Sequence, residues 1–110
     1  MIVENGLGAE DVLNEDGSVN DDYRIHYIQE HAKAMSDAIN LDGVEVMGYT
    51  LWSAIDLISM STGEMTKRYG LIYVDADDNG VGTYNRLRKD SFYWYKQLII
   101  SDGVILNSTK

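Results

Sequence analysis

The sequence has 110 residues, a net charge of −9, 45% hydrophobic residues and no cysteine. This length allows one domain and excludes two, and the lack of cysteine excludes disulfides and thiolate metal sites. The charge argues against nucleic acid as a partner, and no apolar run of about 18 residues exists that would span a membrane. With no secretory signal pattern at the N-terminus, we expect a cytoplasmic protein.

Charge is distributed unevenly along the chain. Residues 1–64 contain 13 acidic and two basic side chains, whereas residues 65–110 contain five acidic and seven basic ones, beginning with Lys67 and Arg68. A cationic pair in an acidic chain indicates one local anionic ligand. The alternative, which composition alone favours, is that Lys67 and Arg68 are solvated surface charges.

The first half of the chain predicts a strand end, a loop and a helix. Residues 1–3 are β-prone and lead into Glu4-Asn5-Gly6, and residues 8–22 form an acidic loop. A helix capped by Asn20 or Asp21 then runs to Asp42-Gly43. One apolar stripe repeats at helical spacing, formed by Ile25, Ile28, Ala32, Met35 and Ile39.

The second half predicts two more strands and a helix. Residues 44–52 form an apolar run of strand length, expected to be buried on both faces as in a parallel sheet. A short strand at 71–74 and a turn-rich loop at 75–82 precede a helix over 85–101. Two parallel strands alone leave both edges unpaired, so the βαβα order predicts one part of a larger α/β sheet.

The aspartate-rich loop at 75–82 is similar to the first half of a calcium-binding loop. Its twelfth position, however, is Arg86, where a bidentate glutamate is required. We predict a turn at this place, and no metal or cofactor.

Two segments contain residues suited to sugar chemistry. Glu4 follows a strand end, a suitable position for a nucleophile, although surface glutamates are common. Trp52 ends the apolar run and suits either sugar stacking or core packing. The polar segment after it contains Ser59, Lys67 and Tyr69, whose hydroxyls and ammonium group suit a phosphate, unless the loop binds nothing.

The order and spacing of these motifs carry a family resemblance. Glu-Asn-Gly at 4–6 is followed by Leu-Trp-Ser-x-x-Asp at 51–56 and Lys-Arg-Tyr-Gly-Leu-x-Tyr-Val-Asp at 67–75. This pattern resembles glycoside hydrolase family 1 over nearly the whole chain, to about residue 100. The resemblance implies that residues 1–110 are a single unit, the C-terminal fragment of a (β/α)8 TIM barrel. That fragment comprises the end of strand seven, strand eight and their helices. From its unpaired strand edges we expect self-association to complete it.

The resemblance also implies roles for individual residues. Members of this family retain configuration, with one carboxylate as nucleophile and a second, about 5 Å away, as acid and base. Glu4 matches the nucleophile and Trp52 the sugar platform. The acid/base glutamate of the family lies in an Asn-Glu-Pro segment, and this chain contains no proline.

The segment after Trp52 distinguishes two subfamilies. Family members that act on unphosphorylated glucosides have a glutamate where this chain has Ser59, and a carboxylate there would repel a 6-phosphate. The resemblance therefore assigns Ser59, Lys67 and Tyr69 to phosphate binding. Because the loop is one residue longer than in many relatives, Ser61 shares this role or replaces Ser59. Met60 stands where phospho-galactosidases tend to have tryptophan, which favours the gluco sugar.

We therefore expect the C-terminal part of a retaining 6-phospho-β-glucosidase, whose substrate is a phosphorylated β-glucoside. Because the acid/base residue is missing, we expect the fragment alone to be inactive. Two alternatives remain: a non-catalytic fragment that forms a homodimer or homo-oligomer through its strand edges, and a fragment of an unphosphorylated β-glucosidase.

Overall fold

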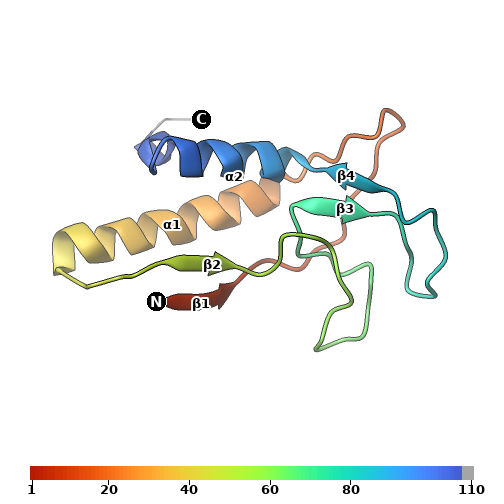
Figure 1. The fold of residues 1–110 in the computed structure, drawn as a ribbon, viewed down its shortest axis with the longest axis horizontal. Helices are drawn as coiled ribbons and strands as arrows, with labels where there is room; N and C mark the ends of the chain where they lie inside the picture. Colours follow the sequence, from red (N-terminus) through yellow and green to blue (C-terminus); the bar gives the residue numbers. More distant parts are fainter. Residues whose placement is uncertain (108–110) are drawn as a thin grey trace.

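The computed structural model describes residues 1–107 and places two α-helices beside two small sheets (Figure 1). In chain order the elements are β1 (Ile2–Asn5), α1 (Asp22–Asp42), β2 (Tyr49–Leu51), β3 (Ile72–Val74), β4 (Arg86–Arg88), α2 (Asp90–Ile100) and the 3-10 helix η1 (Val104–Asn107). The predicted α/β class is confirmed, and the described residues form no closed barrel. None of the described helices is both long and apolar enough to cross a membrane.

Strands β1 and β2 form a parallel pair, as the sequence predicts. Ile2 lies opposite Tyr49 and Asn5 opposite Leu51, with an irregularity between the two positions. The predicted strand over 44–52 is too long, because only Tyr49–Leu51 pair with β1. It is also not buried on both faces: Met47, just before β2, is 84% exposed, since no described element covers that side.

Helix α1 has the predicted bounds and partly the predicted core face. It ends at Gly43, whose φ of 68° is the left-handed cap conformation that glycine adopts without steric cost. Ile28 and Ala32 of the apolar stripe are buried, whereas Ile39, three residues from the end of α1, is 39% exposed. The C-terminal end of α1 projects beyond α2 (Figure 1). The stripe is therefore most deeply buried at Ile28 and Ala32 and becomes exposed toward its C-terminal end.

The last predicted helix begins five residues too early. Residues 86–88 form β4, which pairs antiparallel with β3 so that Tyr73 lies opposite Leu87. Lys89 is extended, and α2 starts at Asp90, whose backbone N–H donates to the carbonyl of Val19. The hairpin supplies hydrogen bonds that a local helical pattern does not reveal, and it overrides the helical periodicity of this segment.

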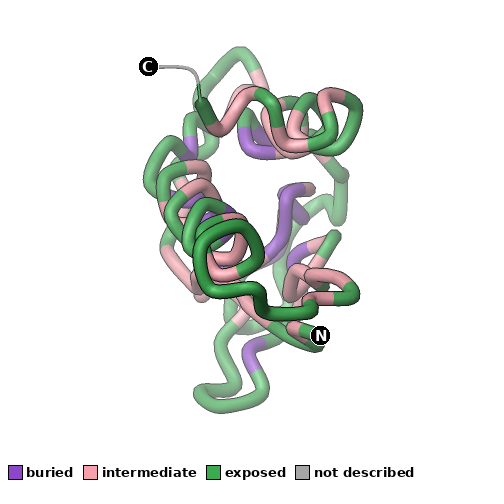
Figure 2. The backbone as a smooth tube through the Cα atoms, turned by 90° about the vertical axis from the view of Figure 1, so that its left-hand side faces the viewer, coloured by how far each residue is buried: buried purple, intermediate pink, exposed green. Residues whose placement is uncertain are grey.

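Burial is concentrated in the middle of the molecule, between the start of α1, β3 and the start of α2 (Figure 2). The two largest side chains that are fully buried there are charged, Arg24 and Lys89, and the apolar Ile28 and Val19 follow them. The centre of this fold is therefore a set of ion pairs surrounded by a small apolar core.

Candidate functional site

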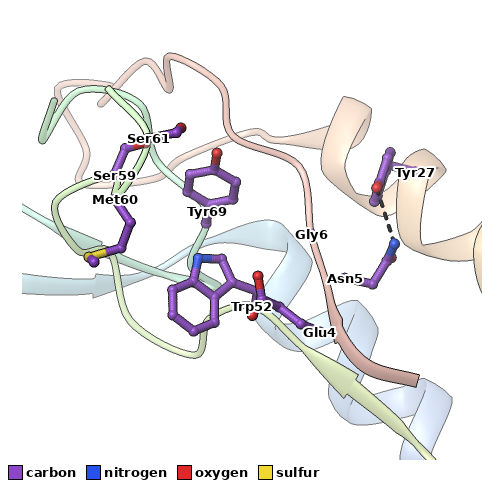
Figure 3. Close-up of a pocket in the computed structure, with 9 residues that line it drawn as sticks. All are labelled: Glu4, Asn5, Gly6, Tyr27, Trp52, Ser59, Met60, Ser61 and Tyr69. Carbon is purple, nitrogen blue, oxygen red and sulfur yellow. Dashed lines mark hydrogen bonds between the residues drawn. The ribbon is translucent and has the colours of Figure 1, made fainter. Parts of the chain in front are cut away.

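The carboxyl ends of β1 and β2 lie side by side and position Glu4 next to Trp52. The backbone N–H of Trp52 donates to the carbonyl of Asn5 at 2.8 Å, which aligns the two strand ends. At Gly6 a Cβ would overlap the carbonyl oxygen of Trp52, so only glycine allows this close approach. The Glu4 side chain is exposed at the open end of β1 and faces the Trp52 ring (Figure 3).

Two tyrosines hold the residue beside Glu4. The Asn5 side-chain amide donates to the hydroxyl of Tyr27 on α1 at 3.3 Å and accepts from the hydroxyl of Tyr49 at 2.5 Å. Burial, together with the neighbouring Tyr95 and Tyr27, raises the pKa of Tyr49 to about 12, so its hydroxyl stays a neutral donor. Neither partner could be found from the sequence, because Tyr27 and Tyr49 lie 22 and 44 positions away from Asn5 along the chain and no local pattern links such distant residues.

The segment after Trp52 folds back as a tight loop that presents two serines. Ser59 is 2% exposed, its N–H donates to the carbonyl of Glu64, and its carbonyl accepts from Gly63. Its hydroxyl lies 3.3 Å from the hydroxyl of Ser61. Ser59 and Ser61, the two candidates for the same role in phosphate binding, are thus hydrogen-bonding neighbours.

Tyr69 reaches the same place from the other end of the loop. Its neighbour Arg68 pairs with Ala9 through two backbone hydrogen bonds of 2.9 Å, and the Tyr69 ring packs against Gly8, where a Cβ would overlap the ring. The ammonium of Lys67 lies 5.7 Å from the centroid of the Tyr69 ring. Lys67 is therefore next to Tyr69 without lining the pocket itself.

These segments enclose an open pocket of about 520 Å³ (Figure 3). Its lining residues are Glu4, Asn5, Gly6, Tyr27, Trp52, Ser59, Met60, Ser61 and Tyr69. The structure thus brings together five of the six predicted site residues, and Lys67 alone stands outside the lining.

The pocket offers a carboxylate, an aromatic face and several hydroxyls. A carboxylate beside an indole suits a reaction at a sugar carbon, because the ring stacks on the apolar face of a sugar. Retaining glycoside hydrolysis also needs a second carboxyl group about 5 Å from the first. Among the described residues that line the pocket, Glu4 is the sole carboxylate.

Arg68 has neither of the roles considered for it from the sequence. It is 4% exposed, so it is not a solvated surface charge, and it points away from the pocket. Its guanidinium donates to the carbonyls of Val74 and Ala76, and its Nε lies 3.2 Å from the Asp56 carboxylate. Arg68 and Lys67 are neighbours in the sequence, but one is an internal ion-pair partner and the other faces the ring of Tyr69.

The Asp56–Arg68 pair belongs to a buried cluster of three acidic and three basic side chains. Lys89 Nζ joins two of the acids, at 2.8 Å from Asp56 and 2.6 Å from Asp11, and Arg24 joins Asp11 at 3.0 Å to Asp21 at 2.5 Å. Equal numbers of opposite charges make such burial tolerable. The members are Asp11, Asp21, Arg24, Asp56, Arg68 and Lys89.

The cluster shifts the pKa of Asp11 and of Arg24. Burial raises the pKa of Asp11, but hydrogen bonds from Lys89 and Tyr23 and the charge of Arg24 outweigh it and lower that pKa overall. For Arg24, burial acts to lower the pKa. The carboxylates of Asp11 and Asp21 outweigh burial, so the pKa of Arg24 is raised overall. The ionised forms are therefore favoured on both sides of the pair.

The comparisons with known proteins agree with the motifs. Residues 1–104 match the family described as Glycosyl hydrolase family 1. The 6-phospho-beta-glucosidase AscB of Escherichia coli K12 is 59% identical to this chain over 103 residues, and the phospho-cellobiase of Klebsiella oxytoca is 60% identical over 103 residues. Each alignment covers 94% of this chain and 22% of the relative, so the chain spans about a fifth of the length of these curated proteins.

Solved structures show the same relationship in three dimensions. The family 1 β-glucosidase from Thermotoga maritima superposes with a TM-score of 0.81 at 39% sequence identity. The match covers 94% of this chain and 22% of the Thermotoga chain. The predicted partial barrel is confirmed by this likeness.

Proposed function

The chain belongs to glycosyl hydrolase family 1, and we propose that it is the part of a retaining 6-phospho-β-glucosidase that carries the nucleophile and binds the phosphate. One observation carries this proposal: Glu4 and Trp52 line the same pocket as the hydroxyl-bearing Ser59, Ser61 and Tyr69. The names of the curated relatives, which are phospho-glycosidases at 59–60% identity, support the same substrate class.

In the proposed reaction Glu4 attacks the anomeric carbon of the sugar. A bond forms between its carboxylate oxygen and that carbon while the glycosidic C–O bond breaks, and the leaving oxygen takes a proton from a second carboxyl group. Water then hydrolyses the glycosyl-enzyme and regenerates the Glu4 carboxylate. Because no other lining residue of the described chain is a carboxylate, we propose that the chain alone does not complete this cycle.

The far side of the pocket suits the 6-phosphate. Ser59, Ser61 and Tyr69 supply neutral hydroxyl donors, and Lys67 beside Tyr69 supplies a positive charge. A carboxylate in place of Ser59 would repel the phosphate. The unphosphorylated β-glucosidase alternative is less well supported, because the Thermotoga β-glucosidase is 39% identical to this chain.

The test places this chain in a complete enzyme. In a hybrid, residues 1–104 replace the matching segment of the Escherichia coli relative, and hydrolysis of p-nitrophenyl-β-D-glucoside 6-phosphate is compared with that of the unphosphorylated glucoside. We expect turnover that requires the phosphate and is lost in Glu4→Gln. We also expect a 2-deoxy-2-fluoro glucoside 6-phosphate to label Glu4, as read by peptide mass spectrometry. Labelling elsewhere, or a preference for the unphosphorylated substrate, would contradict the proposal.

A second candidate function, self-association of a non-catalytic chain, has a separate observation in its favour. The chain exposes 7159 Å², whereas a compact protein of its 12.4 kDa mass exposes about 6,100 Å². The excess of about 1,000 Å² exceeds the roughly 800 Å² that each partner buries in a standard interface. Apolar side chains are exposed on and beside the parallel sheet, among them Val3 of β1 at 74% and Met47 at 84%.

We propose that two copies associate through this surface when no other polypeptide covers it. Light scattering coupled to size-exclusion chromatography should show a dimer that dissociates on dilution, and Val3→Lys should shift the equilibrium to monomer. A monomer at all concentrations would rule out the dimer. A cytoplasmic location, and the absence of nucleic-acid and membrane partners, remain predictions.

A further inference from the structure

The two ends of the phosphate loop, residues 57–69, are held together by one buried carboxylate, that of Asp56. Asp56 immediately precedes the loop and is 6% exposed. Its Oδ1 accepts from the backbone N–H of Gly70, the residue that immediately follows the loop, at 2.9 Å. Lys89 reinforces this closure, because its Nζ lies 2.8 Å from Asp56 and donates to the carbonyl of Gly70 at 2.7 Å.

Arg68 holds the second arm of the loop against the protein interior. Its Nη2 donates to the carbonyls of Val74 at 3.2 Å and Ala76 at 2.8 Å, and its guanidinium stacks 4.3 Å above the Tyr73 ring. Its Nε faces the Asp56 carboxylate at 3.2 Å. A planar guanidinium reaches the two carbonyls, the Tyr73 ring and the carboxylate at once, which a single ammonium group cannot do. The contact of Nε with Asp56 is an ion pair and not a hydrogen bond.

The backbone of Arg68 is equally fixed. It exchanges two hydrogen bonds with Ala9, and its carbonyl also accepts from Arg24 at 2.8 Å. In an extended segment successive side chains point to opposite sides. Because Arg68 points inward, the adjacent Lys67 and Tyr69 point outward together, consistent with the 5.7 Å between the Lys67 ammonium and the Tyr69 ring.

We infer that the buried ion pair between Asp56 and Arg68 is a positioning device for the phosphate-binding side of the pocket. It fixes the separation across the phosphate loop between the Ser59 arm and the Tyr69 arm, so that hydroxyls from both arms meet one phosphate. Neither Asp56 nor Arg68 lines the pocket, and both act through the loop. The inference rests on the proposed function, since it concerns the same ligand.

The strand-end half of the pocket provides an internal reference. Glu4 and Trp52 are aligned by backbone hydrogen bonds between β1 and β2 and by the close approach at Gly6. None of these contacts involves Asp56 or Arg68. Loss of the ion pair should therefore weaken recognition of the phosphate and leave recognition of the sugar ring unchanged.

The experiment measures binding to the full chain by NMR titration of its backbone amides with glucose 6-phosphate and, separately, with glucose. The variants are Arg68→Lys, which keeps the charge and loses the planar fork, and Asp56→Asn, which keeps the shape and loses the charge. We expect the Kd for glucose 6-phosphate to rise about tenfold in either variant, the cost of misplacing one charge-assisted contact. The Kd for glucose should stay within about twofold.

A matched control separates positioning from stability. Ser91 donates to Asp21 in another part of the same buried cluster, away from the phosphate loop. Ser91→Ala should lower Tm and leave both dissociation constants unchanged. Arg68→Lys should lower Tm as well, but it should also raise the Kd for glucose 6-phosphate while the Kd for glucose stays unchanged. Comparing Tm and Kd in the three variants shows which effect follows from the loop.

The outcomes distinguish failure of this inference from failure of the proposed function. Equal affinity of the unaltered chain for the two sugars would overturn the proposed function. A phosphate preference that persists in both Arg68→Lys and Asp56→Asn would overturn the inference alone. Unfolding of both variants, with Ser91→Ala still folded, would assign the pair to overall stability and also overturn the inference.

Discussion

The two halves of the pocket are built in different ways. The strand-end half, with Glu4 and Trp52, is aligned by backbone hydrogen bonds of a two-stranded sheet whose neighbouring side chains are largely exposed. The phosphate-loop half is anchored by buried side-chain charges, from Arg24 on α1, from Lys89 just before α2, and from the Asp56–Arg68 pair. One half depends on backbone hydrogen bonds and the other on a continuous chain of buried ion pairs.

This difference indicates how much of the site the chain can support on its own. A two-stranded sheet is marginal in water because little apolar surface covers it. The charge cluster is complete within residues 11–89, with three acids paired to three bases. We therefore expect the phosphate-loop half to keep its geometry in this chain, and the strand-end half to depend more on covering by another polypeptide.

The largest expected effect is on the charge cluster. Lys89→Met removes the cation that Asp11 and Asp56 share, leaving their carboxylates undercompensated in the interior. Breaking a buried pair in this way costs about 3–5 kcal/mol, to be measured by urea denaturation. The control Lys33→Met, at an exposed position on α1, should stay within about 0.5 kcal/mol. Equal losses in the two variants would mean that the cluster does not dominate stability.

A smaller effect is expected at the strand ends. Gly6→Ala places a methyl group against the Trp52 carbonyl, so the ends of β1 and β2 must separate. Such overpacking costs about 1–3 kcal/mol and should abolish NMR contacts between Asn5 and Trp52. Gly48→Ala is the matched control, because its Cβ would meet only the end of the Met1 side chain. Intact contacts in Gly6→Ala would show that the ends of β1 and β2 can accommodate a Cβ at this position without separating.

Acid should weaken the cluster through Asp11. The pKa of Asp11 is lower in the folded protein than its ordinary 3.8, so below that pH the unfolded state binds more protons. The stabilisation from this group is fully present above about pH 4 and is lost as pH falls through the lowered value, at about 1.4 kcal/mol per pKa unit. Urea denaturation from pH 6 to pH 2 should show a shallower decline in Asp11→Asn; parallel curves would contradict the assignment.

The smallest expected effect concerns the support of Asn5. Tyr49→Phe removes the hydroxyl that donates to the Asn5 side chain at 2.5 Å, a loss of about 1 kcal/mol. In the hybrid enzyme it should reduce turnover without changing the preference for the phosphorylated substrate, because the phosphate loop is untouched. Tyr93→Phe, at a position that is 53% exposed, should change neither quantity. A changed phosphate preference in Tyr49→Phe would show that the strand-end half and the phosphate-loop half are not independent.

Local patterns in the sequence are sufficient for much of this protein. The apolar spacing of α1 and Gly43 at its end define the longest helix, and Glu4 and Trp52 can be placed together because carboxyl ends of parallel strands share one edge. The family resemblance adds Ser59, Ser61 and Tyr69, which line the same pocket. Their roles in substrate binding stay predictions.

Tertiary structure alone decided the rest, because the deciding contacts join residues far apart in the chain. Arg68 and Lys67 are adjacent basic residues, and only the position of Asp56 shows which one is buried. From the sequence, Lys89 would be assigned to the surface at the start of a helix. In the structure it is buried and pairs with Asp11 and Asp56. The β3–β4 hairpin likewise overrode the helical pattern at 86–88. A local sequence pattern indicates only hydrophobicity and secondary-structure propensity. Whether a charged side chain can be buried depends on the partners that the fold places beside it.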